Sequence, residues 1–204
     1  MDISYSSDAE LLRAEIAAAA ARMIAEDGAD FGSAKRRAAK QILGNRKVRG
    51  DVLPDNAQIE EEVRAYNALF FADTQPARLV ALRRLAAELM AQLAPFSPYL
   101  VGAVLNGTAG AHSDIHLHLF AESAKDVEMY LLNQGIDFEV SEGSSARARA
   151  EPLEVLSFFW RGEGVHLSLY GPEDLRVVRI ERADLRGLTA LLADGTGAQP
   201  DPIP

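Results

Sequence analysis

The chain has 204 residues and a net charge of −9, with 48% hydrophobic residues and no cysteine. These values predict a folded globular protein with one large domain or two small ones. They exclude disulfide bonds and cysteine-based metal or catalytic sites, and no apolar run is long enough to cross a membrane. We therefore expect a cytoplasmic protein that does not enter a membrane.

Residues 1–97 have the sequence pattern of a helical region. Apolar residues recur at helical spacing, capping residues precede the repeats, and glycine or proline follows them. The expected helices cover Asp8–Ala25, Ser33–Leu43, a segment capped by Asp55 or Asn56, and a segment after Pro76. The last segment carries a long apolar stripe, which could support a homodimer as well as a helical bundle.

The segment from Phe31 to Gly50 contains seven basic residues and no acidic one. This strip has two interpretations, a solvent-exposed helix face with its following loop, or a patch that contacts the phosphates of a nucleotide or RNA. Because the whole chain is acidic, the second interpretation favours local contact over general affinity for nucleic acid. The basic residues are Lys35, Arg36, Arg37, Lys40, Arg46, Lys47 and Arg49, among which Lys35, Arg36, Arg46 and Lys47 are our phosphate-contact candidates.

After Pro98 the hydrophobic period changes from 3.6 to 2, which indicates strands. Residues 98–194 are therefore expected to form an α/β region, followed by a disordered tail at 195–204. A four-residue hairpin turn is expected at 161–164, and a mobile loop at 144–149. The expected strands are Tyr99–Leu105, Asp114–Phe120, Asp137–Ser141, Glu154–Trp160, Val165–Tyr170 and Arg176–Glu181, and the expected helices are Ser123–Gln134 and Ala183–Ala193. The predicted fold class is α+β, an N-terminal helical bundle followed by a mixed sheet flanked by helices.

One short segment carries the functional argument. The residues VLNGTAGAHSDIHLHL, from Val104 to Leu119, resemble the signature of the polymerase-β-type nucleotidyltransferase superfamily. That signature is a strand, a Gly-Ser turn, a short connection, and Ser-Asp-hydrophobic-Asp on the next strand. The resemblance implies a nucleotidyltransferase-like sheet, a nucleotide or RNA as partner, and Mg²⁺ or Mn²⁺ held by carboxylates.

The resemblance also implies roles for individual residues. Gly107 and Thr108 match the phosphate-binding turn, and Asp114 matches the first metal carboxylate. His116 stands where the second carboxylate is expected, and the strand that should supply the third presents His166 instead. With two of three carboxylates replaced, the resemblance implies a degenerate member that binds a nucleotide or RNA with weak or no transfer. Asp114 and His116 are then the candidate catalytic residues.

Two other functions remain open at this point. A non-catalytic interaction or regulatory protein could use the same fold. Alternatively, Asp114, His116 and His166 could hold a transition metal such as zinc, since imidazole suits such metals better than Mg²⁺. The polar residues could also simply lie on the wet face of a half-buried sheet, and Asn106-Gly107 could be an ordinary hairpin turn. Asp137 and Glu139 alternate on a short strand and could be substitute carboxylates or ordinary surface residues.

Overall fold

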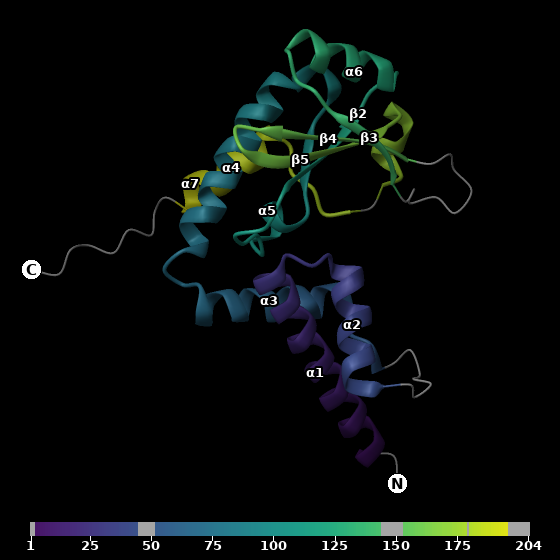
Figure 1. Ribbon diagram of the computed structural model, residues 1–204, viewed down its shortest axis with the longest axis vertical. Helices are drawn as coiled ribbons and strands as arrows, with labels where there is room; N and C mark the ends of the chain where they lie inside the picture. Colours follow the sequence, from purple (N-terminus) through teal and green to yellow (C-terminus); the bar gives the residue numbers. More distant parts are fainter. Residues whose placement is uncertain (1–2, 45–51, 144–152, 179, 196–204) are drawn as a thin grey trace, which may run out of the picture. The chain divides into compact units, whose positions relative to one another are not determined.

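The computed structural model describes residues 3–44, 52–143, 153–178 and 180–195. It confirms the α+β class, with helices first and a five-stranded mixed sheet after them (Figure 1). The chain forms two compact units, one of residues 1–78 with 107–112 and the other of residues 79–106 with 113–204. None of the helices in the described part of the chain is both long enough and apolar enough to cross a bilayer.

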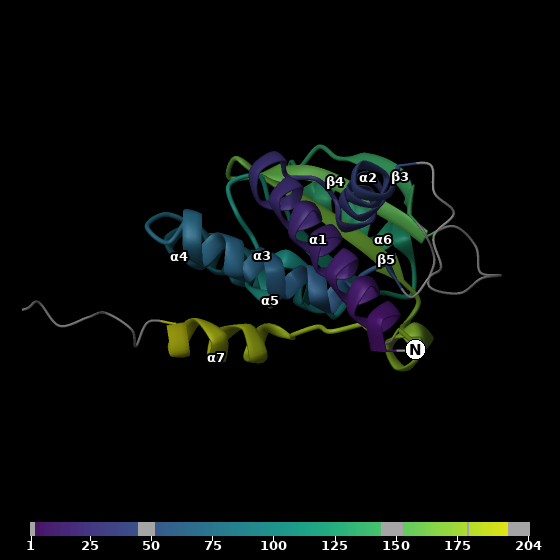
Figure 2. The ribbon, with the colours of Figure 1, turned by 90° about the horizontal axis from the view of Figure 1, so that it is seen from below.

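The first unit is built on three helices, of which α1 packs against the other two (Figures 1 and 2). Their bounds are Ile3–Asp27 for α1, Phe31–Leu43 for α2 and Asn56–Phe70 for α3. Asp55 caps α3 as expected, and its carboxylate accepts from the Gln58 backbone N–H while the Gln58 side chain accepts from the Asp55 N–H. The cap of α2 is Asp30 rather than Ser33, because the Asp30 carboxylate accepts the Ser33 backbone N–H.

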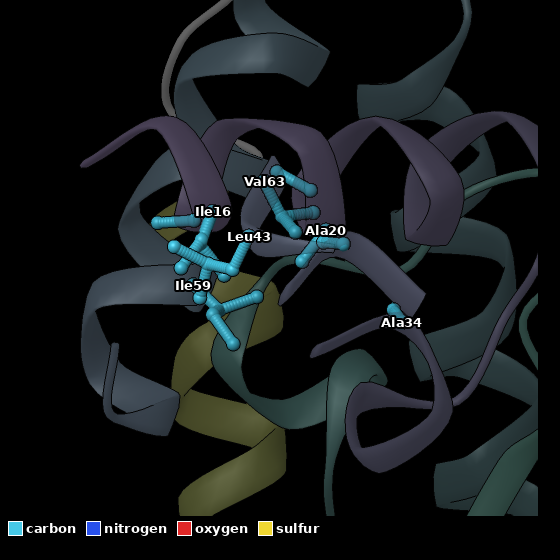
Figure 3. Packing of buried hydrophobic residues seen from close by; sticks show 9 residues of the cluster. Ile16, Ala20, Ala34, Leu43, Ile59 and Val63 are labelled. Carbon is cyan, nitrogen blue, oxygen red and sulfur yellow. The ribbon is translucent and has the colours of Figure 1, made fainter. Parts of the chain in front are cut away.

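The core of the first unit combines small residues on α1 and α2 with larger aliphatic residues. Alanines such as Ala20 and Ala34 are fully buried, which lets the helix backbones approach closely. Ile16, Ile59 and Val63 fill the space between them, as Figure 3 shows. The alanine-rich sequence of α1 therefore favours close packing of the helices as well as helix formation.

The second unit is a sheet with the strand order β1-β2-β5-β4-β3. The parallel pair is β2–β5, and the other neighbouring pairs are antiparallel. In Figure 2 the strands β3, β4 and β5 lie side by side, as their pairing requires. The strands are β1 (Tyr99–Val101), β2 (Ile115–Phe120), β3 (Glu139–Gly143), β4 (Leu153–Trp160) and β5 (Glu163–Tyr170). The remaining elements are α4 (Gln75–Gln92), which begins in the first unit, the 3-10 helices Ala94–Phe96 and Pro172–Arg176, α5 (Ala103–Asn106), α6 (Ala124–Asn133) and α7 (Leu185–Gly195).

The first strand is shorter than the sequence predicts. The strand expected over Tyr99–Leu105 ends at Val101, because Gly102 takes a φ of 70° and the one-turn helix α5 follows. Val104 and Leu105 are buried from this helix instead of from a strand. Apolar residues alone do not distinguish these two arrangements.

Two further expectations in the sheet region were wrong. The turn between β4 and β5 has two residues, Arg161 and Gly162, which both have positive φ as a tight hairpin requires. The described part of Arg176–Glu181 contains the end of a 3-10 helix and a turn, not a strand. The guanidinium of Arg182 donates to the carbonyl oxygens of Leu175 and Val178 and so holds this turn in place.

The loop expected at 144–149 and most of the tail at 195–204 lie outside the described residues. The same holds for most of the loop expected after Gly44, and with it for Arg46, Lys47 and Arg49.

Candidate functional site

The candidate site lies on one face of the sheet in the second unit. Because β2 and β5 are parallel and in register, His116 lies directly beside His166. Their rings stack with 4.8 Å between centroids. Asp114 immediately precedes β2 and reaches the same pair. The expectation that the strand carrying His166 neighbours the strand carrying His116 is confirmed, and these three residues form one group.

A chain of hydrogen bonds fixes the His166 ring. Its Nε2 atom lies 3.1 Å from Asp114 Oδ2, and its Nδ1 atom lies 2.8 Å from Ser157 Oγ. An ionised carboxylate only accepts hydrogen bonds, so Nε2–H donates to Asp114, and Nδ1 accepts from the Ser157 hydroxyl. The network therefore selects one tautomer and one ring orientation.

Sequence reasoning missed Ser157. Its position on β4 pairs with His166 on β5 across the hairpin. A two-residue turn at Arg161-Gly162 sets this register, whereas a four-residue turn does not. A correct prediction of the two-residue turn would therefore have placed Ser157 beside His166.

Gly164 provides the space for the Asp114 carboxylate. A Cβ atom on residue 164 would lie 2.3 Å from Asp114 Oδ1 and 2.6 Å from its Cγ atom. Real atoms do not approach so closely, so the placement of Asp114 depends on glycine at the start of β5.

A pocket of about 360 Å³ opens beside this hydrogen-bonded chain. It brings Asp137 and Glu139 to the same cavity as Asp114, although the sequence left their role open. No lysine or arginine side chain contributes to its described lining, and Phe159 is 81% exposed at its edge. The lining residues are Asp114, Asp137, Phe138, Glu139, Ser157, Phe158, Phe159, Gly164, Val165 and His166. A bare phosphate group would face carboxylates here without a compensating cation.

Burial lowers the pKa of two histidines on this face, His116 and His118. Neighbouring atoms crowd the His116 ring although part of the side chain remains exposed, and this loss of water lowers its pKa. The adjacent His166 lowers the pKa of His116 further, and Asp114 opposes the shift. Burial lowers the pKa of His118 to about 4, with smaller contributions from Arg182 and His116.

The donor set does not fit the Mg²⁺ site that the resemblance implies. Mg²⁺ requires oxygen ligands in octahedral geometry, whereas two of the three positions carry imidazoles and Asp114 Oδ2 already accepts from His166. In the described part of the chain, no three His, Asp or Glu side chains are grouped so as to hold a metal ion. The structure therefore gives no support to a zinc-type site on Asp114, His116 and His166.

Gly107 and Thr108 lie in the first unit, whereas Asp114 lies in the second. Thr108 is buried, and its carbonyl oxygen accepts from the Asn67 side chain. The carbonyl oxygen of Gly107 accepts from Gln75. Side chains of the first unit thus fix the backbone of this turn, and its convergence with Asp114 stays a prediction.

The basic strip is described in part. Lys35 and Arg36 lie on α2, where Lys35 is half-buried and Arg36 is exposed. Arg37 on the same helix lies 4.0 Å from Asp27. Arg46 and Lys47 lie outside the described residues, so the phosphate contacts expected of this strip remain predictions.

The chain was also compared with known proteins. No protein-family model, no curated protein and no solved structure matches the chain.

Proposed function

We propose that the chain is a nucleotidyltransferase-like protein that binds a nucleotide and has lost metal-dependent nucleotidyl transfer. The observation that carries this proposal is the grouping of Asp114, His116 and His166 on two parallel strands. Asp114 and His116 stand at the first two carboxylate positions of the signature, and His166 lies beside His116 on the strand from which the third is expected. A single carboxylate remains among them.

The start of the sheet supports the same proposal. The resemblance expects a strand, a glycine turn and a short connection before the aspartate. In the second unit β1 ends at Val101, Gly102 turns the chain with a φ of 70°, and α5 follows before Asp114. We therefore assign the glycine turn of the signature to Gly102-Ala103 in place of Gly107-Thr108.

The chemistry of the group argues against transfer. Attack on the α-phosphorus of a nucleoside triphosphate needs a deprotonated hydroxyl, and the leaving pyrophosphate takes the electron pair of the broken P–O bond. Two bound metal ions normally stabilise the negative charge on the attacking and the leaving oxygens. Here Asp114 is engaged by His166, and the lowered pKa of His116 keeps that imidazole uncharged near neutral pH. Neither Asp114 nor the uncharged His116 imidazole replaces the missing positive charge.

Pyrophosphate release tests the catalytic half of the proposal without knowledge of the acceptor. The purified chain is incubated with each nucleoside triphosphate, Mg²⁺ or Mn²⁺, and total RNA or protein as acceptors. We expect no faster release than from Asp114→Asn. Release that requires Asp114 would overturn the loss of transfer, and absence of binding to every nucleotide in a thermal-shift panel would overturn the binding half.

Restoring the carboxylates gives a stronger test of the assignment. The double variant His116→Asp, His166→Asp should bind Mn²⁺ at least about tenfold more tightly than the original chain, measured by the loss of the free Mn²⁺ paramagnetic resonance signal. The matched control is His116→Asp, Thr189→Asp, which adds the same charge but puts the second carboxylate on an exposed residue of α7. Equal Mn²⁺ affinity in both double variants would show that these positions are not a degenerate metal site.

A further inference from the structure

The strand registers bring four polar side chains into one row across the sheet. On β4, Ser157 pairs with Glu139 of β3 on one side and with His166 of β5 on the other. His166 in turn pairs with His116 of β2. Directly paired residues point their side chains to the same side of a sheet. A hydroxyl, a carboxylate and two imidazoles from four neighbouring strands therefore lie next to one another on one face.

Three groups on this face have the order of a nucleophile, a base and a carboxylate that orients the base. The Ser157 hydroxyl donates to His166 Nδ1 at 2.8 Å, and His166 Nε2 donates to Asp114 Oδ2 at 3.1 Å. The two ring nitrogens are exchanged relative to the serine proteases, but the direction of every hydrogen bond is the same. A hydroxyl so placed can give its proton to the imidazole as it attacks an electrophile.

This hydrogen-bonded chain is open to small molecules. The side chains of His166 and Asp114 are 32% and 46% exposed, and Ser157 is half-buried. All three line the pocket of about 360 Å³, a volume within the range of about 300–1,000 Å³ that small-molecule sites occupy. A ligand in the pocket therefore contacts this group directly.

The rest of the pocket favours a substrate with a positive charge. Asp137 and Glu139 contribute exposed carboxylates, and Glu139 lies directly beside Ser157 across the strand pair. Phe138 and Phe159 contribute aromatic rings, which attract cations as well as apolar groups. A substrate with a carboxylate or phosphate next to the reacting carbon would be repelled here.

We infer that Ser157 is the nucleophile of an esterase site in the second unit, with small cationic carboxylic esters as its substrates. His166 is the general base, and Asp114 is a positioning residue that holds the His166 ring. This activity goes beyond the proposed nucleotide binding and does not depend on it. It also gives Asp114 and His166 a function that requires no metal ion.

The reaction has two steps. In the first, Ser157 Oγ bonds to the ester carbonyl carbon while its proton passes to His166 Nδ1. The bond from that carbon to the alcohol oxygen breaks, and the alcohol leaves with the electron pair and the proton from Nδ1. In the second step, water attacks the acyl group and gives a proton to Nδ1. The bond from the acyl carbon to Ser157 Oγ breaks, Oγ takes the proton back from Nδ1, and the carboxylic acid leaves.

Covalent labelling of the full chain tests the nucleophile. Diisopropyl fluorophosphate should place one diisopropylphosphoryl group on Ser157, located by peptide mass spectrometry, as the Oγ–P bond forms and fluoride leaves. We expect no such label in Ser157→Ala, and labelling about a hundredfold slower in His166→Gln. The matched control is Ser168→Ala, which removes another half-buried hydroxyl from the same face of β5 and should label like the original chain. A Ser157 that stays unlabelled in the original chain would overturn the inference.

Asp114→Asn tests the positioning role. An amide at residue 114 can donate to His166 Nε2, which moves the ring proton to Nδ1, so that Nδ1 no longer accepts from Ser157. The maximal rate of labelling should then fall at least about tenfold, whereas the reagent concentration that gives half of this rate should change less than about threefold. Circular dichroism checks that the variant is folded. An unchanged maximal rate would show that Asp114 does not position the base.

A matched pair of acetate esters tests the substrate class. Acetylcholine and 3,3-dimethylbutyl acetate have the same shape and differ by one positive charge. We expect kcat/KM to be about tenfold higher for acetylcholine, and we expect the double variant Asp137→Asn, Glu139→Gln to lose this preference. Equal values for the two esters in the original chain would overturn the cationic substrate class. Hydrolysis of both esters no faster than by Ser157→Ala would overturn the esterase activity.

Discussion

At the scale of single residues, the Asp114 carboxylate occupies space that any side chain on residue 164 would need. Gly164→Ala should therefore displace the carboxylate and break its hydrogen bond to His166 Nε2. We expect the ¹⁵N signals of the His166 ring to shift in the direction seen in Asp114→Asn. Because Asp114 is 46% exposed, the free energy of unfolding should fall by less than about 1 kcal/mol. Unchanged ring signals would mean that Asp114 does not hold His166.

His118 makes the stability of the fold depend on pH. Its side chain is 8% exposed, its ring lies 4.8 Å from that of Tyr170, and burial lowers its pKa to about 4 from an ordinary value of 6.5. The unfolded chain then binds a proton more readily than the folded chain between these values. The free energy of unfolding is therefore highest above pH 6.5, and it declines as the pH falls toward 4.

The variant His118→Phe removes this proton binding and tests the effect. Between pH 7 and pH 5 we expect the original chain to lose roughly 2 kcal/mol more unfolding free energy than the variant, since one pKa unit corresponds to about 1.4 kcal/mol. Urea unfolding at the two pH values measures the difference. Parallel losses in both proteins would exclude His118 as the source.

At the scale of elements, the start of α3 depends on one capping box. Asp55 and Gln58 satisfy each other's backbone N–H groups at the start of α3, which packs against α1. Asp55→Ala should lower the free energy of unfolding by about 1 kcal/mol, measured with urea. Asp73→Ala, an exposed aspartate in the turn after α3, is the control and should change it by less than about 0.5 kcal/mol.

Sequence patterns predicted the elements whose signals are local. Asp55 was recognised as a cap, and the strict alternation after Asp114 gave β2 within one residue of its observed start. The same reasoning extended β1 across Val104 and Leu105, because a buried helical turn and a buried strand are equally apolar over so few residues.

The candidate site was predictable to the extent that it depends on strand pairing. Alternation placed Asp114 and His116 on one face, and the resemblance placed His166 on the strand expected to complete the same site. Ser157 and Gly164 were not found, because their roles depend on the hairpin register and on a backbone approach that no periodicity records.

At the scale of the whole molecule, the segment Gly107–His112 belongs to a different unit from the residues that flank it in sequence. Its partners Asn67 and Gln75 are more than thirty residues away along the chain. Contacts of this range leave no periodic pattern, so the sequence could not predict that Asn67 and Gln75 hold the backbone of this segment.

Because the chain forms two compact units, a core mutation in one unit should destabilise that unit and leave the other folded. Ile16 is fully buried among α1, α2 and α3, so Ile16→Ala should cost about 2–5 kcal/mol in the first unit. Amide hydrogen exchange should then quicken in α1, in α3 and also in residues 107–112, while β2 and β5 keep their protection. Leu117→Ala, a buried leucine of β2, is the reciprocal control and should quicken exchange in the sheet. If Ile16→Ala leaves 107–112 protected, that segment does not unfold with the helices.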